Sequence, residues 1–368
     1  MKEKVLIVGA GLTGIVLAER FAADGRQVLI IDKRTHIGGN CYDFKDKNGI
    51  LVKKYGPHIF HTDYEDVWDH LSKFTEWVPY RHEVVSFVDG NFIPMPFNLN
   101  TLYKAFPADV ANSLEKKLID CFGFGQKIPI LELRDSKEKE IKDLANFIYE
   151  KMFLNYTRKQ WGLKLEDIDP AVSGRVPIVI RRDNSYFPDK YQGIPGQGYT
   201  KMFKKMLKNK NIQVSLNTDY KKVKNKLKYS TLFYTGPIDE FFGYKFGRLE
   251  YRRLKIKFKT LKQEEYQPRA VVNYPNDFDF TRVTEFKKFL GQKNKKTTIG
   301  FEYPGEKGFM VWPVLTEKNK EIFQKYWQEA EKLKEKNVFF IGRLAEYKYY
   351  DMDDIVKNSL DLYNKITK

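Results

Sequence analysis

Apolar and polar residues follow different periods along the chain, and the first segment predicts an α/β protein. Residues 4–8 (KVLIV) and 27–32 (QVLIID) are almost wholly apolar, as buried strands of a parallel sheet are. A Gly-rich turn and a helix through about Asp24 separate the two runs, and Gly25 ends that helix. This strand–turn–helix–strand order indicates a parallel sheet.

The middle of the chain changes from strand-like to helical patterning. Residues 83–98 alternate around Asp89-Gly90, which predicts a hairpin with a type I′ turn. From about 99 to 170 the apolar residues recur at helical spacing, and 176–199 is expected to be mostly loop with short strands.

Strand-like runs return in the second half of the chain. A helix is expected after Gly198, and strands are expected at 212–216, 230–235, 254–258, 269–274 and 297–303. The end of the chain predicts a helix over 317–336, a strand over 338–342 and a last helix from about Asp353. Because buried strands like the first two return near 230 and 340, we expect the nucleotide domain to be assembled from discontinuous segments.

Composition excludes several classes of protein. The 368 residues are 42% hydrophobic and 15% aromatic, enough for a large core and unlike a disordered chain. Cys41 and Cys121 form neither a CxxC motif nor a disulfide framework, which is typical of a reducing cytoplasm. No apolar run reaches the ~18 residues of a membrane span. The net charge of +17 has two explanations: lysines on solvated helix and loop faces, or an anionic partner. Without a nucleic-acid motif, the anionic partner would be a phosphorylated small molecule.

A dinucleotide-binding fingerprint follows the first strand. Gly9, Gly11 and Gly14 form G-x-G-x-x-G at the start of the helix, where the second glycine lets the main chain approach a pyrophosphate. Asp32 ends the next strand, 18 residues after Gly14, where an acid that holds the ribose is expected. A further glycine pair before Asn40 favours FAD over NAD, and the chain has no second complete fingerprint.

Several further segments resemble the UDP-galactopyranose mutase family, and they run in family order along essentially the whole chain. They are Gly56–Thr62 (GPHIFHT), Tyr156–Trp161 (YTRKQW), Ser173–Pro177 (SGRVP), Tyr191–Pro195 (YQGIP), Phe280–Glu285 (FTRVTE) and Gly342–Asp353 (GRLAEYKYYDMD). The resemblance implies a flavin-dependent isomerase that interconverts UDP-galactopyranose and UDP-galactofuranose. N5 of reduced FAD is then the nucleophile toward the anomeric carbon, with no net redox change.

The same resemblance implies the residues of the site. The leaving group is an anionic diphosphate, which the planar fork of arginine binds well, and Arg175 and Arg282 match the family's diphosphate arginines. With His61 they are the expected catalytic residues. His58 and His61 lack a third ligand, so no metal is expected; His61 favours plain galactose over 2-acetamido sugars.

Two larger sets follow from the family pattern. The residues expected to bind FAD are Gly9, Gly11, Thr13, Gly14, Asp32, Lys33, Gly39, Asn40, His58, Ile59, Asp219, Tyr220, Arg343, Asp354 and Ile355. The residues expected to bind substrate are His82, Met152, Tyr156, Thr157, Trp161, Arg175, Tyr186, Asn273, Arg282, Trp312, Tyr349 and Asp351. The last helix should direct its positive end at the reduced flavin. His82, Met152 and Trp312 depart from the residues common in relatives.

Three domains are predicted: an FAD-binding Rossmann-like domain, a helical substrate-lid domain and an antiparallel sheet domain. Their ranges are 1–80 with 207–243 and 318–368, then 99–175, and finally 81–98 with 176–206 and 244–317. We also expect an external reductant such as NAD(P)H, a homodimer, a cytoplasmic location and a role in supplying cell-surface polysaccharide. Two alternatives stay open: an FAD-dependent amine oxidase or desaturase-like oxidoreductase, and a flavin-carrying binding module without catalysis.

Overall fold

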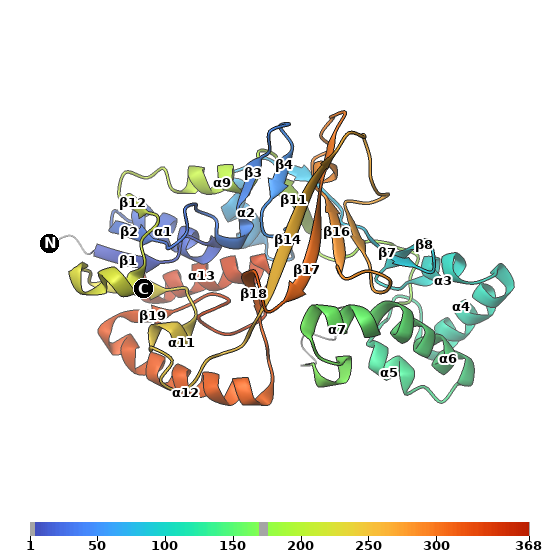
Figure 1. Cartoon of the computed structure of the whole chain (residues 1–368). Helices are drawn as coiled ribbons and strands as arrows, with labels where there is room; N and C mark the ends of the chain where they lie inside the picture. The colour runs from blue at the N-terminus through green and yellow to red at the C-terminus, as the bar shows by residue number, and fades with distance from the viewer. Residues whose placement is uncertain (1–3, 169–175, 368) are drawn as a thin grey trace. The chain divides into compact units, whose positions relative to one another are not determined.

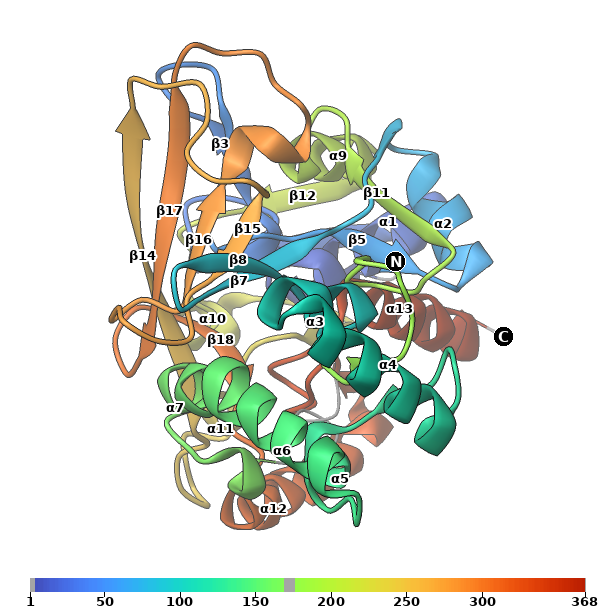
Figure 2. The ribbon, with the colours of Figure 1, turned by 90° about the vertical axis from the view of Figure 1, so that its right-hand side faces the viewer.

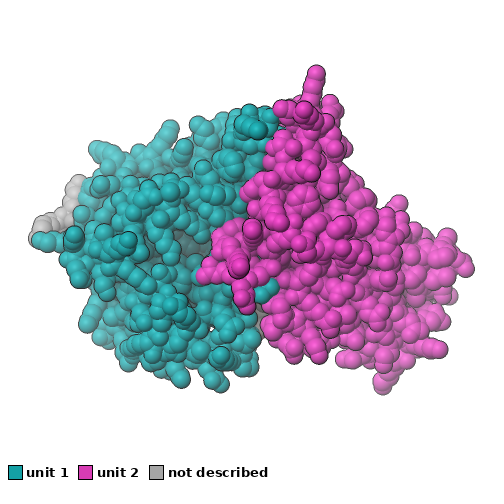
Figure 3. All heavy atoms as spheres, in the orientation of Figure 1, with its two compact units in different colours: residues 1–80, 189–252, 310–368 teal, residues 81–188, 253–309 magenta. Residues whose placement is uncertain are grey.

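The chain folds into two compact units, each built from separate stretches of sequence. The structure, a computed structural model, describes residues 4–168 and 176–367. Unit 1 comprises residues 1–80, 189–252 and 310–368, and unit 2 comprises 81–188 and 253–309 (Figure 3). The finer division into three domains stays a prediction.

Unit 1 is built on a five-stranded parallel sheet. Its order is β12 (Ile212–Ser215), β2 (Gln27–Ile31), β1 (Lys4–Val8), β13 (Thr231–Tyr234) and β19 (Val338–Phe340). These strands come from three stretches far apart in the sequence, as the returning apolar runs predicted. The prediction of an α/β, Rossmann-like fold is confirmed.

Helices cover both faces of this sheet because successive side chains of a strand point to opposite faces. Val5 and Ile7 pack with α1 (Leu12–Ala23) and α13 (Met352–Thr367). Both helices are labelled in Figure 1. Leu6 packs on the other face with Tyr220 and Phe241. The elements that contribute to this second face are α10 (Tyr220–Val223), α11 (Ile238–Phe241) and α12 (Glu317–Leu333).

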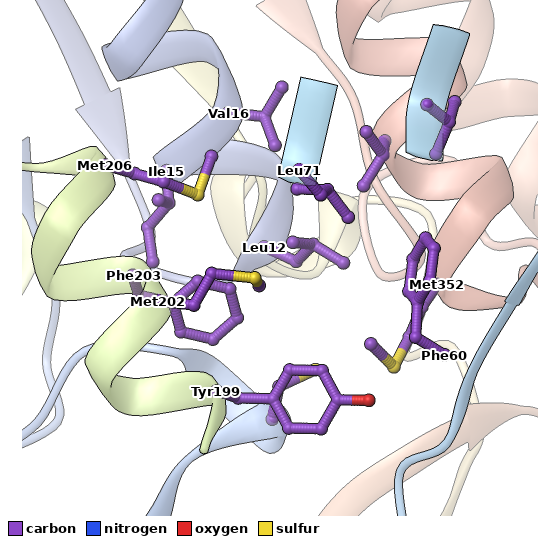
Figure 4. Close-up of a cluster of buried hydrophobic side chains, with 13 residues drawn as sticks. Leu12, Ile15, Val16, Phe60, Leu71, Tyr199, Met202, Phe203, Met206 and Met352 are labelled. Carbon is purple, nitrogen blue, oxygen red and sulfur yellow. The ribbon is translucent and has the colours of Figure 1, made fainter. Parts of the chain in front are cut away.

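A separate apolar cluster fixes the start of α1. Figure 4 shows Leu12 of α1 beside Met202 and Phe203 of α9 (Tyr199–Met206), with Phe60 and Met352 in the same cluster. Leu12 is the first residue of α1, so this packing holds the N-terminal end of the helix in place.

Smaller sheets complete unit 1. The strands β3 (Asp43–Lys45) and β4 (Leu51–Lys53) form an antiparallel hairpin. A three-stranded sheet has the order β5 (Phe60–Thr62), β11 (Tyr191–Pro195) and β6 (Trp77–Pro79), and α2 (Glu65–Ser72) follows β5. Trp68 of α2 stacks on Trp77 of β6 with 4.5 Å between the ring centroids.

Unit 2 contains a mainly antiparallel sheet. Its strands follow the order β14 (Tyr251–Leu261), β17 (Thr297–Gly305), β16 (Arg282–Glu285), β15 (Val271–Asn273), β7 (Val84–Val88) and β8 (Asn91–Met95). The β7–β8 hairpin turns at Asp89 and Gly90, whose φ angles of 48° and 83° are both positive, as a type I′ turn requires. The hairpin prediction is confirmed. Strand β18 (Phe309–Pro313) begins where the chain returns to unit 1.

The helical part of unit 2 lies between residues 99 and 161 (Figure 2). It contains α3 (Leu99–Ala105), α4 (Ala108–Phe122), α5 (Ile130–Arg134), α6 (Lys139–Ile148) and α7 (Asn155–Trp161), and the short strands β9 (Lys127–Ile128) and β10 (Ile178–Val179) pair. Tyr149–Leu154 form a π-helical turn between α6 and α7. Such turns occur frequently at functional sites. None of the described helices is long and apolar enough to span a membrane.

Candidate active site

The three fingerprint glycines differ in what the fold demands of them. Gly9 has a φ of 112°, and a Cβ there would lie 2.1 Å from Oγ1 of Thr235. A Cβ on Gly14 would lie 2.0 Å from the carbonyl oxygen of Gly9. Gly11 has room, because the nearest atom to its Cβ position is Cα of Gly39 at 3.9 Å. Gly9 and Gly14 therefore serve the fold itself, whereas Gly11 leaves its main chain open.

The second glycine pair lies against this open main chain. The Gly38 N–H donates to the carbonyl of Ala10 at 2.7 Å. A Cβ on Gly39 would lie 3.0 Å from Cα of Gly11. Helix α1 has Gly11 as its N-cap, with no side-chain cap and no acid in the first turn. Its first N–H groups and its positive dipole end are thus available to a phosphate. We call Gly9–Gly14 with Gly38–Asn40 the glycine cradle.

Asp32 joins the cradle to the end of β2. Its Oδ2 accepts from the Ala10 N–H and its Oδ1 from the Arg34 N–H, both at 2.8 Å. Each carboxylate oxygen keeps a second lone pair that can accept from a ribose hydroxyl. Asn40 is oriented by two bonds, accepting from Nη2 of Arg34 at 2.9 Å and donating to the carbonyl of Met310 at 3.1 Å.

Three other predicted FAD ligands lie beside Asp32. The Thr218 N–H donates to the Asp32 carbonyl at 2.8 Å, so the loop after β12, which leads to Asp219 and Tyr220, adjoins the loop after β2. The Asp219 side chain caps α10 by accepting from the Lys221 N–H. Lys33 is directed at Glu240, with 3.3 Å between Nζ and Oε2.

Arg343 follows β19 beside the cradle, which its neighbour Gly342 approaches closely. The preceding Gly342 has a φ of 98°, and a Cβ there would lie 2.7 Å from Oγ1 of Thr13. Arg343 donates through Nη2 to the carbonyl of Tyr350, and its guanidinium lies 5.8 Å from the Tyr349 ring. That ring stacks on Trp312 with 6.4 Å between centroids. The structure thus brings Thr13, Arg343, Tyr349 and Trp312 into one neighbourhood.

The start of α13 carries more negative charge than the dipole argument assumed. Asp353 and Asp354 both lie in its first turn, with Ile355 next, and Asp354 accepts from the Asp351 N–H at 3.0 Å. Burial and the neighbouring Asp354 raise the pKa of Asp353. Two carboxyl groups at this position offset part of the positive end of the helix.

The loop with His58, Ile59 and His61 leads into β5. Nδ1 of His61 lies 3.2 Å from Oδ2 of Asp189, and both side chains are largely buried, so the carboxylate orients the imidazole. Nδ1 of His58 lies 3.0 Å from the carbonyl oxygen of Gly56. No cluster of three possible metal ligands exists among the described residues.

In unit 2 the sheet places Arg282 between two polar neighbours. Strand register sets Arg282 of β16 opposite Asn273 of β15 on one side and opposite Glu302 of β17 on the other. Oε2 of Glu302 accepts from both Nη2 and Nε of Arg282, at 2.7 and 3.0 Å, and Glu302 is 1% exposed. Burial lowers the pKa of Arg282, but Glu302 more than reverses this, so the net shift is upward and the cation is kept.

Further predicted substrate residues gather around Arg282. Tyr156 and Tyr186 lie close enough to Arg282 that their phenolate forms would raise the pKa of its guanidinium. Asn273 is buried, and its Oδ1 accepts no hydrogen bond from any described residue. A ligand donor would satisfy this oxygen, since buried polar atoms are rarely left unpaired.

Of the remaining predicted substrate residues of unit 2, Met152, Thr157 and His82 are buried and Trp161 is half-buried. Met152 lies in the π-helical turn, and Thr157 and Trp161 lie in α7. The buried His82 ring packs among the rings of Tyr186, Phe187 and Phe289. Arg175 lies outside the described residues.

Sequence reasoning missed residues that hold the predicted ones. Glu302 and Asp189 orient Arg282 and His61, and no spacing rule connects residues so far apart in the chain. Lys159 donates through Nζ to the carbonyls of Tyr274, Phe278 and Phe280 at 2.6, 3.0 and 3.2 Å, which ties α7 to the loop before β16. Its place inside the YTRKQW segment was a signal that could have been used.

Comparison with known proteins agrees with this arrangement. A sequence model of a family described as UDP-galactopyranose mutase matches residues 151–349, and one of a NAD(P)-binding Rossmann-like domain matches 7–74. A probable UDP-galactopyranose mutase of Klebsiella pneumoniae is 35% identical, over 97% of this chain and 93% of the relative. The chain belongs to the UDP-galactopyranose mutase family. It is therefore a flavin-dependent mutase with FAD as its cofactor, and the cradle fits a dinucleotide.

Three further comparisons refine this assignment. A dTDP-fucopyranose mutase of Escherichia coli is 36% identical over the full length of both chains. A crystal structure of reduced UDP-galactopyranose mutase superposes with a TM-score of 0.72 at 14% identity, covering 100% of this chain and 96% of that one, which shows a shared fold. A zeta-carotene desaturase of Arabidopsis thaliana matches 20% of the chain, so the desaturase alternative lacks full-length support.

The glycine geometry predicts that one fingerprint substitution in this mutase affects FAD binding and another affects stability. Gly11→Ala should leave the melting temperature within about 2 °C of wild type, because the protein leaves room for the methyl group. It should weaken FAD binding at least about tenfold, because we expect the pyrophosphate to occupy that room. Gly14→Ala should lower the melting temperature clearly. Thermal unfolding of the apoproteins and FAD titration measure the two effects. Tight FAD binding by Gly11→Ala would contradict the cradle.

The Arg282–Glu302 pair predicts a stability difference between two glutamate substitutions in unit 2. Glu302→Gln should lower the free energy of unfolding by about 3 kcal/mol, because it removes a buried carboxylate that is the counter-charge of Arg282, whose side chain is only 22% exposed. Glu265→Gln is the matched control: Glu265 is 72% exposed and pairs with Lys288, so about 0.5 kcal/mol or less is expected. Denaturant unfolding at neutral pH compares them, and equal values would contradict a buried pair.

Proposed function

We propose that this mutase interconverts UDP-galactopyranose and UDP-galactofuranose. The observation that carries the proposal is Arg282, a cation fixed by the buried Glu302 and set beside the unsatisfied Asn273, in a chain that also has an intact glycine cradle. An enzyme that must release and recapture a nucleoside diphosphate needs such a cation, whereas an amine oxidase does not.

One set of residues is proposed to hold the cofactor and another to bind the nucleotide diphosphate. FAD, when bound and reduced, supplies the nucleophile at N5 toward the anomeric carbon of the sugar. The cradle main chain, Asp32 and Asn40 hold its pyrophosphate and ribose side. Arg282, with Arg175 as the proposed second cation, binds the diphosphate and stabilises it as its charge increases on leaving. His61, oriented by Asp189, is proposed to border the sugar.

A second nucleotide sugar has a specific observation in its favour. The Escherichia coli relative named for dTDP-fucopyranose is as similar to this chain as the relatives named for UDP-galactopyranose. The two substrates share the diphosphate and a six-membered sugar ring, so the same cations serve both. UDP-galactose remains the proposal, and dTDP-fucose is the alternative to be measured beside it.

Other parts of the biology are proposals of the same kind. The isomerisation consumes no reducing equivalents per turnover, so an external reductant such as NAD(P)H is proposed to act only in loading the flavin. A homodimer, a cytoplasmic location and a role in supplying galactofuranose to cell-surface polysaccharide are proposed from family membership.

The decisive test is the dependence of turnover on the redox state of the flavin. Dithionite-reduced enzyme should convert UDP-galactofuranose to UDP-galactopyranose, and oxidised enzyme should not, because N5 is nucleophilic only after reduction. Chromatography of the nucleotide sugars under anaerobic conditions measures both, with dTDP-fucofuranose as a parallel substrate. Equal rates in the two redox states would sink the proposed mechanism.

The diphosphate cations can be tested one at a time. Arg282→Ala and Arg175→Ala should each lower kcat/KM by two to three orders of magnitude, roughly the loss of a transition-state hydrogen-bond donor, while the protein stays yellow. Arg282→Lys keeps the charge but not the fork, and should recover only part of the loss. Arg81→Ala, an exposed arginine paired with Asp183, is the control. Full activity in either alanine variant would remove that residue from the mechanism.

A further inference from the structure

The β3–β4 hairpin contains a lysine that is almost wholly buried. Lys53 ends β4 and is 2% exposed, and the strand register sets it opposite Asp43 of β3. Removing an ammonium group from water costs free energy unless hydrogen bonds and charges compensate. The surroundings of Lys53 therefore indicate what this cost supports.

The contacts of Lys53 connect three segments. Nζ donates to the carbonyl oxygen of His58 and lies 5.2 Å from the centroid of the Tyr199 ring. The titratable groups that face it are the carboxylate of Asp43, the thiol of Cys41 and the phenol of Tyr199. Asp43 accepts from the N–H groups of Tyr199 and Thr200 at 2.7 and 2.9 Å, so its charge is shared with the start of α9.

Lys53 contacts two segments that are expected to border the flavin. Cys41 ends the turn Gly39–Cys41, and Gly39 of that turn abuts Gly11 in the cradle. The His58 carbonyl belongs to the loop that, with Ile59, is proposed to border FAD. One ammonium group therefore bonds the His58 loop and faces Cys41, which ends the Gly39–Cys41 turn.

We propose that Lys53 is a positioning residue for FAD, whose ammonium holds the main chain at His58 and makes FAD affinity depend on pH. The inference rests on the proposed place of His58 and Ile59 beside the flavin. A charged donor forms a stronger hydrogen bond to a carbonyl than a neutral amine does. The loop is therefore held best when Lys53 carries its proton.

The sign of the pH effect follows from the surroundings. Burial lowers the pKa of Lys53 to about 7, although Asp43 and Cys41 oppose the shift. Below that pH the ammonium form dominates and FAD should bind tightly; above it the amine dominates and affinity should fall. By linkage, FAD binding should raise the pKa of Lys53 in return.

The test is FAD titration of the apoprotein between pH 5.5 and 8.5, followed by flavin fluorescence. Wild-type Kd should rise about tenfold from pH 6 to pH 8, the size of one lost charge-assisted bond. Lys53→Met should bind about tenfold more weakly at pH 6 and show no such rise, although His36, His58 and His61 are unchanged. Lys53→Arg, which stays charged, should keep tight binding to pH 8.5. Lys45→Met, an exposed lysine of the same hairpin, should follow wild type. A Lys53→Met profile identical to wild type would overturn the inference.

A measurement without substitution covers the case in which Lys53→Met does not fold. Wild-type protein labelled with ¹³C at lysine Cε should show one resonance that titrates near pH 7 and moves to higher pH when FAD is added. Absence of such a resonance would overturn the inference. Mutase turnover is measured in parallel. Active enzyme whose FAD affinity does not depend on pH would contradict only the role of Lys53. Protein that never binds FAD would contradict the proposed function itself.

Discussion

The approach of two glycine main chains at the carboxyl edge of the parallel sheet is the constraint on which the rest of the structure depends. Gly11 and Gly39 come so close that a side chain on Gly39 would press on Gly11. This contact is possible because Gly9 and Gly14 let β1 turn into α1 over three residues and because Asp32 bonds the Ala10 N–H. The first N–H groups of α1, which no side chain caps, are therefore available to a pyrophosphate, and the close approach tolerates few substitutions.

Charge is handled differently in the two units. In unit 1 the cradle offers main-chain dipoles, and the first turn of α13 is partly neutralised by its own aspartates. In unit 2 a full cation, Arg282, is kept charged and oriented by a buried carboxylate. Because Glu302 cancels much of the net charge, Arg282 contributes direction more than long-range attraction. A fixed fork loses little entropy when it binds a phosphate.

Local patterns predicted what depends on neighbouring residues in the chain. Buried strands, the β7–β8 turn and the glycine fingerprint each follow from residues within a short window, and the structure confirms them. Glu302 could not be found this way, since its pairing with Arg282 is set by strand register across 20 residues. Lys53 carries no signal in a Lys-rich sequence, because burial of a single lysine depends on the tertiary packing of β3, α9 and the His58 loop.

The shared Rossmann-like unit explains why fold alone does not identify the substrate, and the chemistry of the candidates shows where selectivity must arise. Thymine differs from uracil by one methyl group, and apolar contacts, such as those the buried Met152 is proposed to make, discriminate a methyl group by only about 1–3 kcal/mol. The 2′-hydroxyl of UDP and the 6-hydroxyl of galactose are larger differences, because a site built to bond a hydroxyl is left with unpaired polar atoms when it is missing. Preference between the two nucleotide sugars should therefore depend on buried polar side chains such as Asn273 more than on apolar ones.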